Sequence, residues 1–138
     1  MDKDVIQNLY KVLCPNDPVN VLSERIEQIK KDQNNFLFVY EEAGNIIGTV
    51  FFTICLSPMY GFQPFGVVEN FVVDEKYRGQ GIGTALTNHI FKIGRENRCF
   101  VVKLLSSSFR EGAHRFFEKN DFNGTDKKGF VKYLNRDK

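Results

Sequence analysis

The sequence contains no tryptophan, only three cysteines and four prolines, and no long apolar run. The cysteines, Cys14, Cys55 and Cys99, are far apart and form no C-x-x-C pair, which indicates reduced thiols and argues against zinc or another metal. No segment reaches the roughly 18 consecutive apolar residues of a membrane span. The N-terminal stretch MDKDVIQNLYKVLCP also lacks the apolar core of a signal peptide. We therefore expect a cytoplasmic protein with no membrane partner.

An excess of charge of one sign is also missing. The 19 basic and 17 acidic residues are spread along the chain and give a net charge of +2, so nothing points to nucleic acid. Apolar residues make up 42%, including 14 Phe, as in an ordered globular protein. A chain of 138 residues is predicted to form one domain, residues 1–138.

Two helices are predicted before any strand. Apolar residues at helical spacing place the first over residues 3–13, ending before Pro15. The second covers residues 20–32, with Asn20 or Ser23 as its N-cap.

Strands follow the helices. Residues 36–42 and 46–56 are rich in aromatic and β-branched residues and are joined by AGN, which predicts an antiparallel hairpin. A third strand, 67–74, leads through glycines into a helix that reaches about Asn97, with an apolar face at Ile82, Leu86, Ile90 and Ile93.

The rest of the chain completes an α/β fold. The apolar run 100–105 predicts a strand buried on both sides and parallel to 67–74, since a helix connects the two. Ser108 and Glu111 have the spacing of a capping box and open a short helix that ends near Asn120. Residues 130–135 predict a last strand. The sheet is therefore mixed, mostly antiparallel, and flanked by helices.

The stretch DEKYRGQGIGTAL places a glycine-rich turn between a strand and a helix. Such a turn aims backbone N–H groups and the positive end of the helix dipole at one point, which suits a phosphate; a tight turn without a ligand is the alternative. The dinucleotide pattern fails, since Thr84 or Leu86 takes the place of its third glycine, and no P-loop sequence is present. The pattern R-x-x-G-x-G does match, at Arg78, Gly81 and Gly83.

These residues resemble motif A of the GCN5-related N-acetyltransferases, the GNAT superfamily. The segment VVENFVVDEKYRGQGIGTAL is similar to that motif, and AHRFFEKNDF, residues 113–122, is similar to motif B. The order of elements is also similar over nearly the whole chain. The family has a strand before its first helix, whereas only MDKD precedes the helix here.

The resemblance implies an N-acetyltransferase that uses acetyl-coenzyme A as cosubstrate and a primary amine, more readily of a small molecule than of a protein, as acceptor. It implies that main-chain groups of Phe71, Val72 and Val73 hold the pantetheine arm and the acetyl group. It assigns the pyrophosphate to Arg78, Gly79, Gln80, Gly81, Ile82, Gly83 and Thr84, and extends the coenzyme site to Arg110 and Phe117. Homodimers are common in the family.

Glu69 is the candidate general base. Strand alternation is expected to place it on one face with Val67, Phe71 and Val73, where burial would raise the pKa of its carboxyl group toward the value that a base needs. An acidic residue of this strand is the base in many family members. The alternatives are a solvated side chain or one that only orients the substrate.

Two departures from the family pattern concern motif B. The tyrosine that protonates the leaving thiolate in much of the family falls at Phe117, which has no proton to give. Asp121 replaces the glycine of the family's G-F pair. Water or a hydroxyl is left as proton donor, with candidates Ser106, Ser107, Tyr60 and Tyr133. These departures also allow a second function, a catalytically weak acetyl-coenzyme A-binding protein that regulates a partner.

Overall fold

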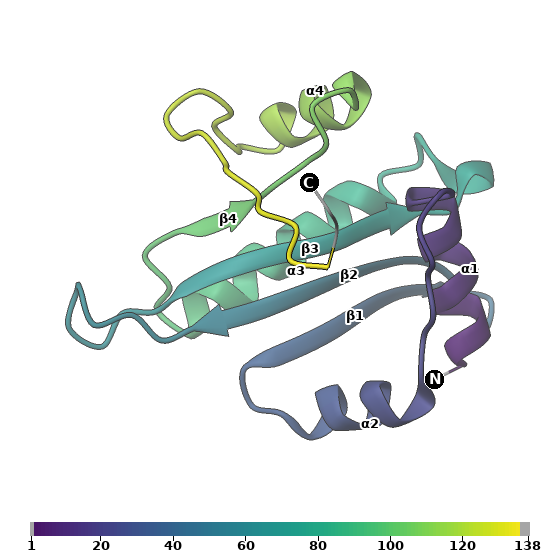
Figure 1. The fold of residues 1–138 in the computed structure, drawn as a ribbon, viewed down its shortest axis with the longest axis horizontal. Coiled ribbons are helices and arrows are strands. Elements are labelled where there is room, and N and C mark those ends of the chain that lie inside the picture. The colour runs from purple at the N-terminus through teal and green to yellow at the C-terminus, as the bar shows by residue number, and fades with distance from the viewer. Residues whose placement is uncertain (1, 136–138) are drawn as a thin grey trace. The chain divides into compact units, whose positions relative to one another are not determined.

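The computed structural model describes residues 2–135, which form two compact units divided after Leu104. The first unit contains α1 (Lys3–Leu13), α2 (Ser23–Lys31), β1 (Asn35–Glu42), β2 (Asn45–Cys55), β3 (Phe65–Val73), the 3-10 turn η1 (Glu75–Tyr77), α3 (Ile82–Glu96) and β4 (Val102–Leu104). The second unit contains α4 (Glu111–Lys119). Figure 1 shows these elements along the chain. The assignment of residues 1–138 to one domain stays a prediction.

The first unit is built on a four-stranded sheet in the order β1-β2-β3-β4. The pairs β1–β2 and β2–β3 are antiparallel and β3–β4 is parallel, which confirms the predicted fold class. Ala43 and Gly44 connect β1 to β2, with φ angles of 50° and 82°. Two central residues with positive φ are typical of a type I′ turn, whose twist matches that of a hairpin.

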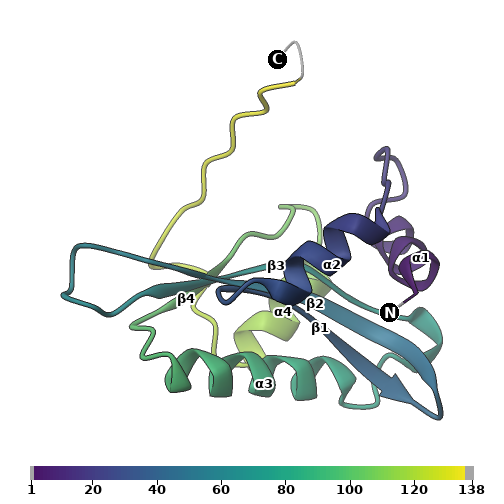
Figure 2. The same ribbon diagram turned by 90° about the horizontal axis from the view of Figure 1, so that it is seen from below.

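Helices cover both faces of this sheet (Figure 2): α3 lies along one face, and α1 and α2 lie on the other. The core on the α3 side joins residues from β2, β3 and α3: Ile47, Val50, Phe52, Ile54, Val68, Ile82, Leu86 and Ile90. The predicted apolar face of α3 is confirmed, since Ile82, Leu86 and Ile90 are buried. On the other side, α1 buries Ile6 and Leu9. These layers fix where β3 ends and where α3 begins.

Several predicted helix starts and strand ends are wrong. Neither Asn20 nor Ser23 caps α2, whose N-cap is Leu22, and Arg110 rather than Ser108 is the N-cap of α4. These caps failed because capping depends on the backbone angles at a residue as well as on its side chain. The strand 100–105 is shorter, covering only Val102–Leu104, and it is half-buried rather than buried on both sides, because Lys103 is exposed.

The predicted strand at 130–135 is also wrong. The structure describes all of these residues and none of them is in a strand. The side chains of Phe130 and Leu134 are 85% and 91% exposed. Apolar and β-branched residues form a strand only where a neighbouring strand shares their backbone hydrogen bonds, and residue type alone does not supply that neighbour.

In the second unit, α4 ends in a backbone motif that explains an unusual residue. Asp121 has φ of 75°, its N–H donates to the carbonyl of Glu118, and the N–H of Phe122 donates to the carbonyl of Phe117 at 3.0 Å. This is a Schellman motif, in which the residue after the C-cap is left-handed and commonly glycine. The position of Asp121 is thus one that glycine fits best.

Candidate active site

An extra residue in β3 breaks the alternation of this strand. Glu69 pairs with Phe51, and Val72 pairs with Thr49, so three steps along β3 match two along β2. Asn70 lies inside this bulge with φ of 54°, in the left-handed region. A bulge of one residue moves the following side chains to the other face of the sheet.

The prediction that Glu69 shares a face of the strand with Phe71 and Val73 is therefore wrong. Phe71 and Val73 pack against the core cluster on the α3 side. Glu69 lies on the opposite face, because its partner Phe51 alternates with the α3-facing Val50 and Phe52. Glu69 thus lies on the side of the sheet that α1 and α2 share, and the bulge moves Phe71 and Val73 to the other side.

Glu69 combines access to solvent with partial desolvation. The residue as a whole is exposed, but burial of part of its side chain raises the pKa of the carboxyl group above the ordinary value of 4.5. No charged partner contributes to this shift, since desolvation is its sole resolved cause. A carboxylate with a raised pKa in contact with solvent can accept a proton from an ammonium group.

The pairing of β3 with β4 stops next to Glu69. The last parallel pair joins Val68 to Leu104, whereas β3 continues to Val73. β4 therefore does not accompany the part of β3 that contains Phe71, Val72 and Val73. Main-chain amides on such a strand edge can bind an extended amide-containing chain in the manner of an added strand.

The glycine-rich turn follows directly. The side chain of Asp74 accepts a hydrogen bond from the N–H of Lys76 at 3.0 Å and caps η1. The side chain of Arg78 folds back, and its Nε donates to the carbonyl of Val73 at 3.3 Å. The turn is thereby attached to the end of β3.

Two glycines give the turn its shape. Gly79 and Gly81 have φ of 79° and 83°, and Gly81 is the N-cap of α3. A Cβ at either position would meet no atom within 4 Å, so backbone conformation rather than space requires glycine there. The next N–H groups belong to Ile82, Gly83 and Thr84 in the first turn of α3, where backbone donors have no partner within the helix. This arrangement fits the pyrophosphate of a coenzyme.

The side chains of the glycine-rich turn differ in their exposure to solvent. Gln80 and Thr84 are exposed, whereas Ile82 is buried in the core cluster. Ile82 can therefore contribute only its backbone to a ligand. Thr87, one turn further, donates its hydroxyl hydrogen to the carbonyl of Gly83 at 2.9 Å, which satisfies a buried polar group beside the turn.

Arg110 and Phe117 belong to the second unit and are not placed with the other site residues. Phe117 is 9% exposed and its ring packs edge-on against Phe116 and Phe122, with centroids 5.5 and 5.8 Å away. Of the candidate proton donors, Ser106 has a buried hydroxyl with no hydrogen-bond partner among residues 2–135. A buried polar group without a partner calls for an explanation, and a ligand group is one.

Histidine and cysteine add no second site. His89 packs its ring edge-on against Phe38 at 4.6 Å, and Nε2 of His114 hydrogen-bonds the carbonyl of Ser107. Across the described part of the chain, no three His, Cys, Asp or Glu side chains gather as a metal site would need. Within that same part, every helix is too short or too polar to cross a membrane.

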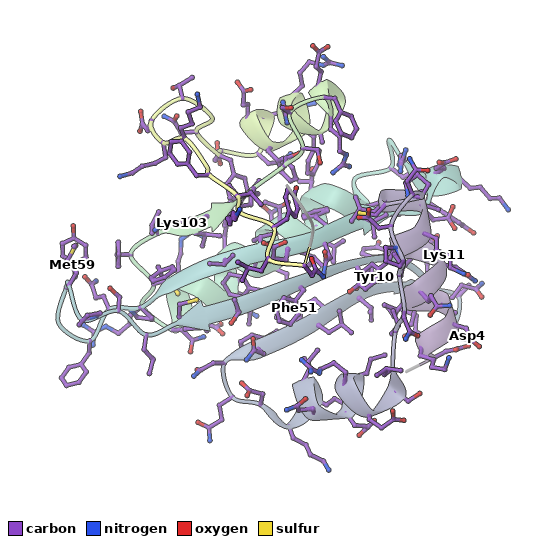
Figure 3. The ribbon with its side chains drawn as sticks, in the orientation of Figure 1. Asp4, Tyr10, Lys11, Phe51, Met59 and Lys103 are labelled. Carbon is purple, nitrogen blue, oxygen red and sulfur yellow. The ribbon has the colours of Figure 1, made fainter. Side chains whose placement is uncertain are left out.

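Tyr10 and Asn70 were missed as residues of interest. Tyr10 lies on α1, where this helix packs on β2 and β3 (Figure 3), and partial burial raises the pKa of its phenol against a smaller opposing effect of the Asn70 side chain. The one signal in the sequence was the asparagine itself, a residue depleted in strands and tolerant of positive φ. The phenol gave no signal, because Tyr10 falls between the apolar positions of an ordinary amphipathic helix.

Together the bulged strand and the glycine turn define an α/β protein in which a strand with a partly desolvated carboxylate leads through a glycine turn into a helix. The sequence profile of the acetyltransferase (GNAT) family matches residues 6–122, so the chain belongs to this family.

Individual relatives agree with this assignment. Over 88 residues the chain is 34% identical to glucosamine 6-phosphate N-acetyltransferase of Trypanosoma brucei brucei. The match covers 62% of this chain and 56% of that enzyme, so it spans little more than half of the relative's length.

Solved structures extend the likeness to the whole fold. A protein of Agrobacterium tumefaciens strain C58 assigned to the acetyltransferases has 27% identity and a TM-score of 0.86, covering 96% of this chain and 93% of that one. An acetyltransferase of Trypanosoma brucei has 25% identity and a TM-score of 0.75, with coverage of 96% and 93%.

Proposed function

We propose that this protein transfers the acetyl group of acetyl-coenzyme A to a primary amine of a small molecule. The observation that carries the proposal is the position of Glu69 in a GNAT chain: a partly desolvated carboxylate stands on the bulge of the strand that leads into the phosphate-binding turn.

The coenzyme would extend from the turn along β3. The N–H groups at the start of α3, with Gly79, Gln80 and Gly81, hold the pyrophosphate. The part of β3 beyond its pairing with β4 binds the pantetheine arm through main-chain groups. This binding places the thioester carbonyl beside the bulge.

The reaction needs one proton acceptor and one proton donor. Glu69 takes a proton from the ammonium group of the acceptor, and the free amine attacks the thioester carbonyl. The C–S bond then breaks, the acetyl group stays on nitrogen as an amide, and the coenzyme leaves as a thiolate. Phe117 cannot protonate this thiolate, so we assign the proton to water.

The acceptor is proposed from the chemistry around Glu69. Lys103 is exposed on β4 and pairs with Val67, so its side chain shares a face of the sheet with Glu69, and its ammonium lies over the ring of Phe65, 4.6 Å from the centroid. An amine that also bears an anionic group matches this pair. The relative from Trypanosoma brucei brucei is named for such a compound, glucosamine 6-phosphate.

The proposal is tested by release of free coenzyme A thiol with a panel of amines. The panel contains glucosamine 6-phosphate, glucosamine, an aminoglycoside, a polyamine and a peptide amine. We expect amine-dependent thiol release with at least one small molecule, and better turnover of glucosamine 6-phosphate than of glucosamine. Tight coenzyme binding without release for any amine would contradict an enzyme.

Phe117 favours a second candidate, a protein that binds acetyl-coenzyme A and regulates a partner with little turnover. The thiol-release panel separates the two functions. We propose the cytoplasm as the location of either function, since three widely spaced cysteines with no C-x-x-C pair are usual in a reducing compartment. A homodimer stays a prediction.

A further inference from the structure

Lys103 holds its charge above an aromatic ring. Its Nζ lies 4.6 Å from the centroid of the Phe65 ring. An ammonium group over the face of a ring is attracted by the negative charge of that face. Lys103 is exposed, whereas Phe65 is half-buried and belongs to β3. The ring has a fixed place in the sheet and therefore sets the place of this otherwise mobile cation.

The register of β3 relates this cation to Glu69. From Phe65 to Glu69 the strand pairs with β2 without interruption, so both side chains lie on the same face of the sheet. They are four residues apart, roughly 13 Å along a strand. Lys103 pairs with Val67, halfway between the two, and its side chain leans toward Phe65. The ammonium group is thereby turned away from the carboxylate.

Lys103 and Glu69 accordingly do not pair with each other. Within residues 2–135, neither side chain takes part in an ion pair. Their Cα atoms lie on neighbouring strands two positions apart, roughly 8 Å in a sheet, a distance that these two long side chains could span. The contact with Phe65 thus keeps the charge of Lys103 available to an anionic ligand.

The surface between the two charges can hold the body of an acceptor. Val67 is half-buried there, and Thr53 of β2 pairs with it. A partly apolar floor between a carboxylate and an ammonium group fits an amine whose anion is separated from the nitrogen by a compact body, such as a sugar ring. With the nitrogen at Glu69, an anion on the adjoining carbon would not reach the ammonium over Phe65.

We propose that Phe65 is a positioning residue that holds Lys103 as the anion subsite for the acceptor. The spacing between Glu69 and this subsite then selects amines whose anion lies across a ring-sized body from the nitrogen. This inference rests on the proposed function, in which Glu69 accepts the proton of the amine.

Four variants separate this role from plain packing. Lys103→Met removes the charge and keeps most of the length. Phe65→Leu removes the ring and keeps an apolar side chain, whereas Phe65→Tyr keeps a ring. Phe91→Leu is the matched control, because Phe91 lies on α3, which covers the opposite face of the sheet (Figure 2), and has Arg95 5.9 Å from its ring centroid.

Three acceptors test the spacing. Glucosamine 6-phosphate has its anion across the ring from the amine, glucosamine 1-phosphate has it on the neighbouring carbon, and glucosamine has none. We expect the wild type to show its highest kcat/KM with the 6-phosphate. An equal or higher kcat/KM with the 1-phosphate would overturn the selection by distance.

The variants are expected to change KM rather than kcat. Lys103→Met raises KM for glucosamine 6-phosphate about 10- to 100-fold, as for a lost hydrogen bond between charged groups, and leaves KM for glucosamine unchanged. Phe65→Leu raises the former KM about 2- to 5-fold, the strength of an exposed cation–π contact. Phe65→Tyr and Phe91→Leu keep the wild-type KM. Adding Phe65→Leu to Lys103→Met causes no further loss, because Phe65 acts through the lysine.

A second readout needs no turnover. The methylene group next to Nζ of Lys103 is expected to show an upfield ring-current shift in NMR spectra, and Lys103→Met identifies the signal by its absence. Phe65→Leu should lose this shift and Phe65→Tyr should keep it. Glucosamine 6-phosphate should move the wild-type signal more than glucosamine does at the same concentration.

Each part of the inference has its own contrary result. Equal changes of KM for glucosamine and its 6-phosphate in Lys103→Met, or no change in either, would overturn the anion subsite. A KM in Phe65→Leu equal to that in Phe91→Leu would overturn the positioning role. If no amine supports turnover in the wild type, the proposed function fails, and the NMR titration alone decides the subsite: an equal response to both compounds overturns it.

Discussion

Gly66 lies beneath the ring of Phe52, so close that a Cβ on Gly66 would come within 2.5 Å of Cε1 and Cζ. Both residues are buried, on neighbouring strands β3 and β2. The ring belongs to the core cluster between the sheet and α3.

Gly66→Ala is therefore expected to lower the free energy of unfolding by about 1–3 kcal/mol, the usual effect of overpacking a core. Urea denaturation measures it. Gly112→Ala on the exposed surface of α4 is the matched control, where a Cβ meets only a terminal nitrogen of Arg115 at 3.8 Å. That variant should be neutral or more stable by up to about 1 kcal/mol, because alanine favours a helix over glycine. Equal effects of the two substitutions would contradict the packing described.

Asp121→Gly is expected to stabilise the protein. The left-handed Asp121 closes the Schellman motif of α4, and a left-handed L-residue costs roughly 1–2 kcal/mol, part of which glycine recovers. We expect a gain of about 0.5–1 kcal/mol in urea denaturation. Asp121→Ala, which removes the carboxylate without relieving the backbone, should not gain. A gain in both variants would instead point to the charge of Asp121.

Gly81→Ala is expected to weaken coenzyme binding. A Cβ meets no atom at Gly81, so the substitution acts through φ of 83° and distorts the N-terminus of α3. We expect about tenfold weaker binding of acetyl-coenzyme A by isothermal titration calorimetry, equivalent to about 1.4 kcal/mol.

Gly44→Ala is the control for Gly81→Ala. Gly44 has φ of 82°, and a Cβ there also meets no atom within 4 Å, but it lies in the β1–β2 hairpin turn. The two variants should lose similar stability, roughly 1–2 kcal/mol, while Gly44→Ala binds the coenzyme normally. If Gly81→Ala binds acetyl-coenzyme A as tightly as the wild type, the turn is not part of the coenzyme site.

The pH dependence of activity should show the raised pKa of Glu69. The base acts only when ionised, so kcat/KM rises with pH through an inflection above 4.5, the ordinary value. The same shift affects stability in the opposite direction. Because the folded protein binds this proton more tightly than the unfolded chain, the free energy of unfolding falls as pH rises through the pKa of folded Glu69. Glu69→Gln should lose both the rise of kcat/KM with pH and the fall of the free energy of unfolding. If kcat/KM of this variant still falls at acid pH as in the wild type, another group is the one that titrates.

Much of the fold could be predicted because its signals are local. The apolar spacing in residues 3–13 matches α1, and the aromatic strands around AGN match the hairpin of β1 and β2. The turn at Arg78 to Thr84 could be predicted because its glycines have no substitute at positive φ.

The predictions that were wrong concern features that depend on residues distant in the sequence. Residues 130–135 are rich in apolar residues that favour strands, yet a strand exists only beside another. The bulge at Asn70 reversed the face of Phe71 and Val73, because register is set by pairing with β2, which the local pattern of β3 does not reveal. Glu69 was identified as a candidate from its residue type and place, but the face on which it lies was not.

The role of Glu69 as general base is decided by amine-dependent thiol release of wild type and Glu69→Gln, with acetyl-coenzyme A binding measured on the same samples. We expect Glu69→Gln to lower kcat about 10²- to 10⁴-fold, the usual contribution of a general base, with coenzyme affinity unchanged. Glu41→Gln, on the exposed end of β1, should retain full activity. Equal turnover by Glu69→Gln and wild type at neutral pH would contradict the account.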